Sequence, residues 1–233
     1  MNIFRNLICY PCVRWRMKFH LCVFGGLIVG ILTTVGLFSS FAQNTPASQA
    51  NASIAEAARK QIGVTTSYDP KYVALSYPNG DVATDRGVCT DVVIRALRQH
   101  GIDLQKLVHE DMKNHFSAYP KNWGLTKTDR NIDHRRVPNL MTFFTRNALK
   151  LPISTDGSKF LPGDFVTCTV AGKLPHIMIV SERKGASGHP MIIHNIGSGT
   201  QEEDRLFEFP LTGHYRWKES LKNSSADTTT PRP

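Results

Sequence analysis

Cys89 lies in the segment GVCTD (87–91), between a glycine and the first turn of an expected helix. A thiol at a helix N-terminus lies near free backbone N–H groups and the positive end of the helix dipole. Both favour the thiolate, which is the nucleophilic form. Asp91 would oppose ionisation if it faced the sulfur, so we expect its carboxylate to bind the N–H groups that begin the helix. The segment predicts a nucleophilic cysteine.

A cysteine nucleophile needs a base, and the base needs a residue that orients it. His176 begins the apolar run HIMIVS, and His194 lies in the run MIIHNI. The two runs read as a hairpin, so we expect them to pair. Because side chains alternate along a strand, His194 and Asn195 face opposite sides. Only one of them can orient His176; we favour His194 and keep Asn195 as the alternative.

The cysteine count offers a competing interpretation. Three of the five cysteines, Cys9, Cys12 and Cys22, lie in or before an expected export segment, which leaves Cys89 and Cys168. Two cysteines in an exported protein are typical of one disulfide. A Cys89–Cys168 disulfide would indicate a non-catalytic envelope binding protein. Cys168 also reads as a small apolar residue that packs inward from a strand.

A zinc site would use Cys89, His176 and His194 with one water molecule. These residues lack the close paired spacing that is typical of metal motifs, so we expect neither a metal nor a cofactor.

A basic cluster, His134, Arg135 and Arg136, follows Asp133. Arginine binds a carboxylate through two parallel hydrogen bonds, so the cluster is a candidate clamp for a peptide carboxylate. With Asp91, these three basic residues are the candidate substrate-binding residues. An internal salt bridge and a solvated surface are the alternatives.

Three helices are expected to position these residues. A capping box at Ser53 and Glu56 begins the first helix, which ends at Gly63. The second covers 89–101 and the third 138–150, with Leu149 on its buried side. Residues 66–87 read as an irregular loop or short hairpin. Residues 103–137 read as a polar insertion, in which Tyr119 and Trp123 are candidates to line a groove or to pack in the core.

The last third of the chain has the alternation and turn signals of strands. The runs DFVTCTV, HIMIVSE and PMIIHNI predict three strands, and residues 205–217 one or two more. Helices followed by an antiparallel sheet predict one α+β domain over residues 53–217.

The N-terminus predicts export. Four basic residues and no acidic one lie within residues 1–42, before and beside an apolar stretch within 19–38. The triplet Ser40-Phe41-Ala42 fits cleavage after Ala42. An uncleaved membrane anchor is the alternative, because the stretch is just long enough to span a bilayer. Either outcome places the rest of the chain in the periplasm, free or anchored to the inner membrane.

The composition limits the classes of partner that the protein can have. The formal net charge is +9, with 28 basic and 19 acidic residues. The chain shows no zinc-finger spacing, RNA-binding signature or concentrated basic helix, so we expect no nucleic-acid partner. Residues 43–52 read as a linker and residues 218–233 as a disordered tail. The oligomeric state is not indicated.

From about residue 57 to residue 217 the chain resembles the NlpC-type papain-like cysteine peptidase superfamily. The helix ending in QIG, the helix CTDVVIRALRQHGIDL and the runs LPGDFV, HIMIVS and IIHNIG follow in that superfamily's order. Together with GVCTD, the run NIDHRRVPNL resembles an uncharacterised exported bacterial family within it, DUF1287-like. Thr90-Asp91 stands where the superfamily has Ser-Gly after the cysteine.

The resemblance implies a papain-like fold and a Cys89-His176-His194 triad. Cys89 would attack an amide carbonyl, His176 would protonate the leaving amine, and water would hydrolyse the thioester. The resemblance also implies peptidoglycan as substrate. The expected function is an exported hydrolase, an endopeptidase or amidase.

Overall fold

The computed structural model describes residues 46–218. The expected signal peptide or anchor within 19–38, the cleavage site after Ala42 and the expected tail from 219 to 233 lie outside the described residues. Within residues 46–218, every helix is too short or too polar to cross a bilayer.

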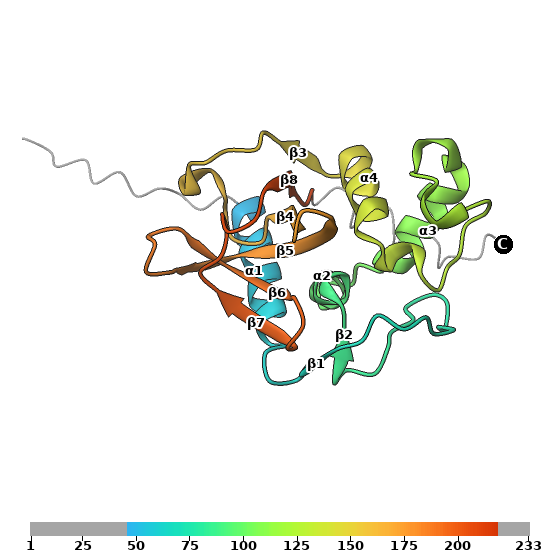
Figure 1. The fold of residues 1–233 in the computed structure, drawn as a ribbon, viewed down its shortest axis with the longest axis horizontal. Helices are drawn as coiled ribbons and strands as arrows, with labels where there is room; N and C mark the ends of the chain where they lie inside the picture. Colours follow the sequence, from blue (N-terminus) through green and yellow to red (C-terminus); the bar gives the residue numbers. More distant parts are fainter. Residues whose placement is uncertain (1–45, 219–233) are drawn as a thin grey trace, which may run out of the picture. The chain divides into compact units, whose positions relative to one another are not determined.

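A six-stranded antiparallel sheet forms the centre of the described unit, and its presence beside the helices confirms the α+β class (Figure 1). The strand order is β3 (Leu149–Leu151), β8 (Leu211–Arg216), β4 (Phe165–Val170), β5 (Leu174–Lys184), β6 (Pro190–Asn195) and β7 (Thr200–Glu203).

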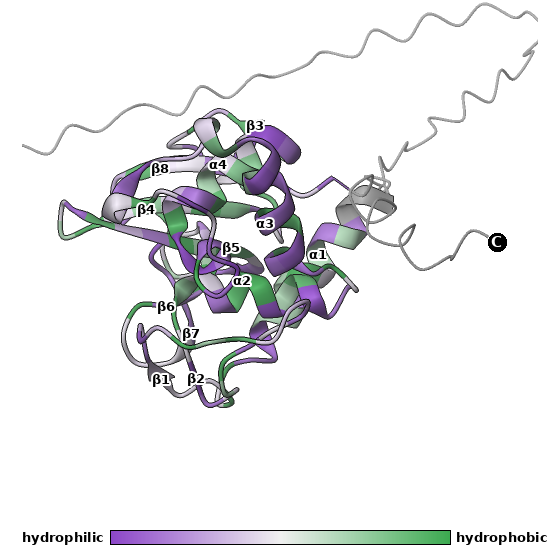
Figure 2. Ribbon diagram, turned by 90° about the vertical axis from the view of Figure 1, so that its right-hand side faces the viewer, coloured by the Kyte–Doolittle hydropathy of each residue, from purple (hydrophilic) through white to green (hydrophobic). Residues whose placement is uncertain are grey.

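Four α-helices accompany the sheet in the described part of the chain. They are α1 (Pro46–Arg59), α2 (Cys89–Arg98), α3 (Leu104–Asn114) and α4 (Val137–Asn147). Both α1 and α2 pack against β5, whereas α3 packs beside α2 and α4. Figure 2 shows green, apolar residues along α2 and much purple on the more polar α3.

Alternation along β5 divides the apolar core between two sides of the sheet. Ile177 and Ile179 pack in the cluster that contains the helices and Cys89. Met178 and Val180 pack in a second cluster, with Cys168. Successive side chains of a strand point to opposite faces, so the two clusters cover opposite faces of the sheet.

The first helix begins earlier than predicted. Residues 46–52 are helical, so the predicted linker 43–52 is wrong over this range. Pro46 suits the first turn of a helix because its missing N–H would be unpaired there. Ser53 lies inside the helix, and its hydroxyl donates to the Ala50 carbonyl oxygen at 2.6 Å. The capping-box interpretation of Ser53 is therefore wrong.

The predicted polar insertion contains α3. Asp103 caps this helix by accepting a hydrogen bond from the Lys106 N–H at 3.1 Å. Leu104, Val108 and Met112, four residues apart, are its buried face. The pattern was present in the sequence, but the polar residues between these positions obscured it.

Three further segments differ from the prediction. Residues 66–87 contain β1 (Ser67–Tyr68) and β2 (Arg86–Gly87), which pair in parallel rather than as a hairpin. The helix α4 buries Leu140, Phe143 and Phe144 as predicted, but Leu149 is exposed in β3. The strand β7, at Thr200–Glu203, was not predicted, whereas β8 confirms a strand within residues 205–217.

Candidate functional site

Cys89 is the first residue of α2. The Asp91 carboxylate accepts a hydrogen bond from the Val88 N–H at 2.6 Å, which confirms the predicted role of Asp91 at the helix start. A Cβ atom on Gly87 would lie 3.0 Å from both Cβ and Oδ2 of Asp91. Glycine at this position therefore permits the close approach of the capping carboxylate.

The Cys89 thiol is neutral in this structure. The residue is 5% exposed, and burial raises the pKa of its thiol to about 12. Backbone N–H groups of Ile177 and Thr90 lower the pKa, but burial outweighs them. Burial therefore opposes the thiolate that the helix N-terminus was predicted to favour.

His176 and His194 are directly hydrogen-bonded. Nε2 of His176 lies 2.8 Å from Nδ1 of His194, and both side chains are buried. Asn195 points the other way, as expected from alternation. Its Nδ2 donates to the carbonyl oxygens of Gly87, at 3.1 Å, and Ser67, at 3.2 Å. The structure thus joins His176 to His194, and uses Asn195 to hold the chain that leads into Cys89.

The backbone around His176 reaches the thiol from β5. Pro175 lines the same pocket as Cys89, and the Ile177 N–H faces the sulfur. The β5–β6 ladder pairs Ile179 with Ile193. Among the described residues, the part of β5 before Ile179, which includes His176, is not paired with β6. The thiol therefore lies at a part of β5 that β6 does not pair with.

The His176 side chain itself turns toward the other face of the sheet. It alternates with Ile177 and lies opposite Cys168 in the β4–β5 ladder. Within residues 46–218 the structure records no hydrogen bond between Cys89 and either imidazole. The backbone of β5 meets the thiol, whereas the predicted triad is not hydrogen-bonded as a unit.

Both Cys89 and Cys168 are free thiols. Cys168 packs in the second cluster, as predicted from its strand, while Cys89 packs with the helices. The Cys89–Cys168 disulfide of the non-catalytic alternative is therefore wrong for this structure. Among the described residues, no group of three or more His, Cys, Asp or Glu side chains is placed to hold a metal ion.

The basic cluster divides between structural and accessible residues. Arg135 donates to both carboxylate oxygens of Asp91 at 2.9 Å, and both side chains are buried. His134 is also buried, and burial lowers its pKa to about 3. The predicted clamp is therefore wrong for Asp91, His134 and Arg135. Arg136 is the exception, because its guanidinium lies 4.4 Å from the centre of the Trp123 ring.

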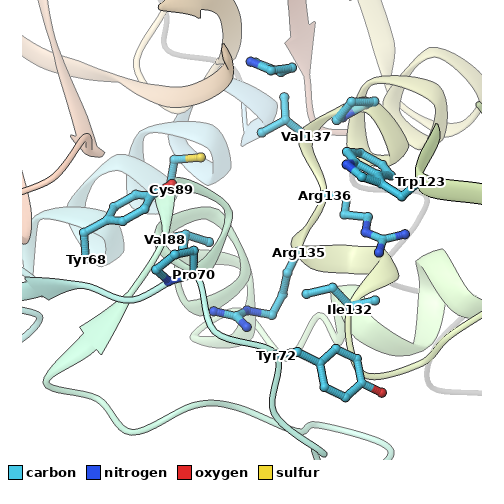
Figure 3. Close-up of a pocket in the computed structure, with 12 residues that line it drawn as sticks. Tyr68, Pro70, Tyr72, Val88, Cys89, Trp123, Ile132, Arg135, Arg136 and Val137 are labelled. Atoms are coloured by element: carbon cyan, nitrogen blue, oxygen red, sulfur yellow. The ribbon is translucent and has the colours of Figure 1, made fainter.

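A pocket of about 430 Å³ opens in front of the sulfur. Figure 3 shows Sγ of Cys89 pointing into the space between the strand that carries Tyr68 and the segment that carries Trp123 and Arg136. Trp123 is 61% exposed and lines this pocket, as expected for a groove residue. Tyr119 is buried and donates to Asp111 at 2.5 Å, so it belongs to the core.

Two residues of the site were not singled out from the sequence. Tyr68 lines the pocket, and its partial burial raises its pKa to about 12. Oε2 of Glu203 lies 2.7 Å from Nε2 of His194. Alternation in TQEE, paired against MIIHNI, was the signal that could have found Glu203.

Comparison with known proteins identifies relatives of the whole described domain. A family model for a domain of unknown function (DUF1287) matches residues 55–217. A protein described as "Uncharacterized protein YijF", from Escherichia coli (strain K12), is 48% identical over 198 residues, covering 81% of this chain and 97% of that protein.

Among solved structures, the chain is similar to "Structure of NlpC1 from Trichomonas vaginalis", with a TM-score of 0.38 and 12% identity. The match covers 72% of this chain and 44% of that one, so the chain spans less than half of its length. The family match and the relative both cover most of this sequence, and the chain belongs to the DUF1287 family.

Proposed function

We propose that this protein is an exported cysteine hydrolase that cleaves an amide bond in peptidoglycan. The observation that carries the proposal is a cysteine at a pocket beside the strand that carries a paired histidine. A cysteine begins a helix and points into the pocket, and the N–H of Ile177 on β5 faces its sulfur. The residue before Ile177 is His176, which is hydrogen-bonded to a second imidazole.

The reaction begins with the thiol of Cys89 in its neutral form. Nδ1 of His176 takes the thiol proton as Sγ attacks the amide carbonyl carbon, and the imidazolium gives that proton to the leaving amine. Water then attacks the thioester with His176 as base, which releases the carboxylic acid and restores the thiol. In this structure the His176 imidazole and the Cys89 sulfur lie on opposite faces of β5. The first step therefore requires the imidazole to turn until Nδ1 reaches the thiol, at the part of β5 that is not paired with β6.

The pocket offers groups that suit a peptide with a free carboxylate. Arg136 carries a positive charge at the Trp123 ring, and it lines the pocket together with Tyr68. Tyr68 stays protonated at neutral pH and can donate a hydrogen bond to a carbonyl oxygen. Stem peptides of peptidoglycan combine amide bonds with carboxylates, which is the combination these groups fit.

The test is incubation of the full chain with whole peptidoglycan, followed by mass analysis of the released fragments. Cys89→Ala is the matched control, since a smaller apolar side chain suits the buried position. We expect the wild type to release fragments with a new amine and a new carboxylate, and Cys89→Ala and His176→Gln to release none. Identical fragments from wild type and Cys89→Ala would overturn the hydrolase.

A binding function without cleavage is the second candidate, and the neutral, buried thiol favours it. In that case the wild type and Cys89→Ala bind peptidoglycan equally in a sedimentation assay and release nothing. An Arg136→Gln variant should weaken this binding, because it removes the pocket charge.

A further inference from the structure

A chain of hydrogen bonds crosses three neighbouring strands. Nε2 of His176 on β5 lies 2.8 Å from Nδ1 of His194 on β6. Nε2 of His194 lies 2.7 Å from Oε2 of Glu203 on β7. Three of the four nitrogens of these two imidazoles have a hydrogen-bond partner. The fourth, Nδ1 of His176, has no hydrogen bond within residues 46–218.

The carboxylate at the end of the chain determines where the protons lie. An ionised carboxylate only accepts hydrogen bonds, so Nε2 of His194 must carry a proton. Burial lowers the pKa of both imidazoles, that of His176 to about 3, so each is neutral and has a single N–H at pH 7.

The remaining assignments follow by exclusion. Nδ1 of His194 is then an acceptor, and Nε2 of His176 must donate to it. Nδ1 of His176 is left with a lone pair, which is the form that a general base needs.

Charged neighbours hold the carboxylate in place. Nη1 of Arg205 lies 3.4 Å from the same Oε2 of Glu203. Arg205 also forms an ion pair with Glu208. The charges of Arg205 and Glu208 both act on the His194 imidazole. Arg205 is the charge that faces His176 on this side of the sheet.

The adjacent glutamate provides an internal comparison. Glu202 lies opposite Ile193 in the β6–β7 ladder, and so it faces the helices rather than the histidines. Its carboxylate accepts from Arg59 at 3.1 Å and from the Ser181 hydroxyl. Two successive glutamates of one edge strand thus serve opposite faces of the sheet.

We propose that Glu203 is a positioning residue, which sets Nδ1 of His176 as the unprotonated nitrogen by fixing the proton of His194. An effect of Glu203 on the reaction rate rests on the proposed hydrolase function. The proton positions on the two imidazoles do not depend on that function. Glu203 touches neither the thiol nor the pocket residues, and it acts only through the two imidazoles.

Proton positions are measurable in the full chain labelled with ¹⁵N-histidine, by two-bond ¹H–¹⁵N correlation spectra at pH 7. In the wild type we expect both His176 and His194 to be protonated on Nε2. In Glu203→Gln the amide can donate as well as accept, so we expect a signal from the Nδ1-protonated form of His176. Glu203→Asp should keep the wild-type form, because it retains an acceptor carboxylate, and Glu202→Gln should leave both imidazoles unchanged.

Each result decides the proposal. A wild-type His176 protonated on Nδ1 would overturn it, as would a Glu203→Gln spectrum identical to that of the wild type. If Glu203→Gln fails to fold, the wild-type and Glu203→Asp spectra still decide the proton positions.

Kinetics give a second readout that separates the two proposals. Glu203→Gln should lower kcat by about tenfold to a hundredfold with little change in KM, the size known for partners that orient metal-bound imidazoles. If wild type releases no peptidoglycan fragments, the hydrolase proposal fails while the spectra still test Glu203. If wild type is active and Glu203→Gln has the same kcat, the positioning role fails alone.

Discussion

At Cys89 two influences on one sulfur atom oppose each other. The helix start and the Ile177 N–H stabilise a thiolate, and burial destabilises it by more. The sequence could place the cysteine at the helix start, because Gly87 and Asp91 mark it. It could not show the burial, because the residues around the thiol come from distant segments, such as Ile177 on β5 and the pocket residues Tyr68 and Val137.

Alkylation of Cys89 should therefore be slow at neutral pH. Only the thiolate reacts with iodoacetamide, and a pKa of about 12 leaves far less thiolate at pH 7 than an ordinary thiol has. We expect the rate to rise continuously to pH 10, measured by mass spectrometry of the Cys89 peptide. A rate that reaches a plateau below pH 8 would instead indicate a resting thiolate–imidazolium pair.

Neighbouring arginines should differ sharply in their effect on stability. Arg135→Met leaves the buried Asp91 carboxylate without its partner and should lower the free energy of unfolding by roughly 3–5 kcal/mol. Arg136→Met removes a partly exposed charge and should cost less than about 1 kcal/mol. Urea unfolding of both full-length variants measures the difference. Equal losses would contradict the structural role assigned to Arg135.

At the level of elements, period and turn signals predicted α2, α4 and the strands β4, β5, β6 and β8. These segments have clear apolar repeats that face the core. The start of α1 was not predicted because its residues are small and polar, as in a linker. The helix α3 was not predicted because polar residues separate its buried positions, Leu104, Val108 and Met112. β7 was missed because TQEE is polar, and its strand conformation depends on pairing with β6.

The turn before β4 packs closely against α1. Gly163 has φ +83°, and a Cβ atom there would lie 1.8 Å from the carbonyl oxygen of Asn51. Gly172 has φ +71° with nothing within 4 Å of its Cβ position. Both positions have a positive φ that favours glycine. Only at Gly163 does the lack of a side chain also allow close contact with another element, α1.

Alanine at these two positions should separate the two effects. Gly172→Ala should cost about 1–2 kcal/mol of unfolding free energy, from the backbone angle alone. Gly163→Ala should cost at least about 2 kcal/mol more, because α1 must shift away from the turn. Thermal or urea unfolding checks both variants. A Gly163→Ala loss no larger than that of Gly172→Ala would show that α1 is not packed there.

The whole domain should lose stability in acid. Burial lowers the pKa of His134 and of His176 to about 3, so the unfolded chain takes up protons below about pH 6.5 that the folded chain does not. Each histidine then removes up to about 1.4 kcal/mol per pH unit. Asp133 acts in the opposite direction, because burial raises its pKa to about 6 and its contribution is lost as pH rises through that value.

The net effect should be a fall in unfolding free energy between pH 6.5 and pH 4, since two histidines outweigh one aspartate. Urea unfolding of the full chain at pH 7, 5 and 4 measures it. Constant or rising stability over this range would mean that the two histidines take up protons in the folded protein.

Arg135 has a wider consequence than its ion pair. The same guanidinium also donates to the carbonyl oxygens of Lys71, at 3.3 Å, and Asp69, at 3.4 Å. One cation therefore links the helix that begins at Cys89 to the segments on both sides of the pocket. These contacts fix the pocket walls in advance, so a ligand of the proposed kind would pay little conformational entropy for ordering them.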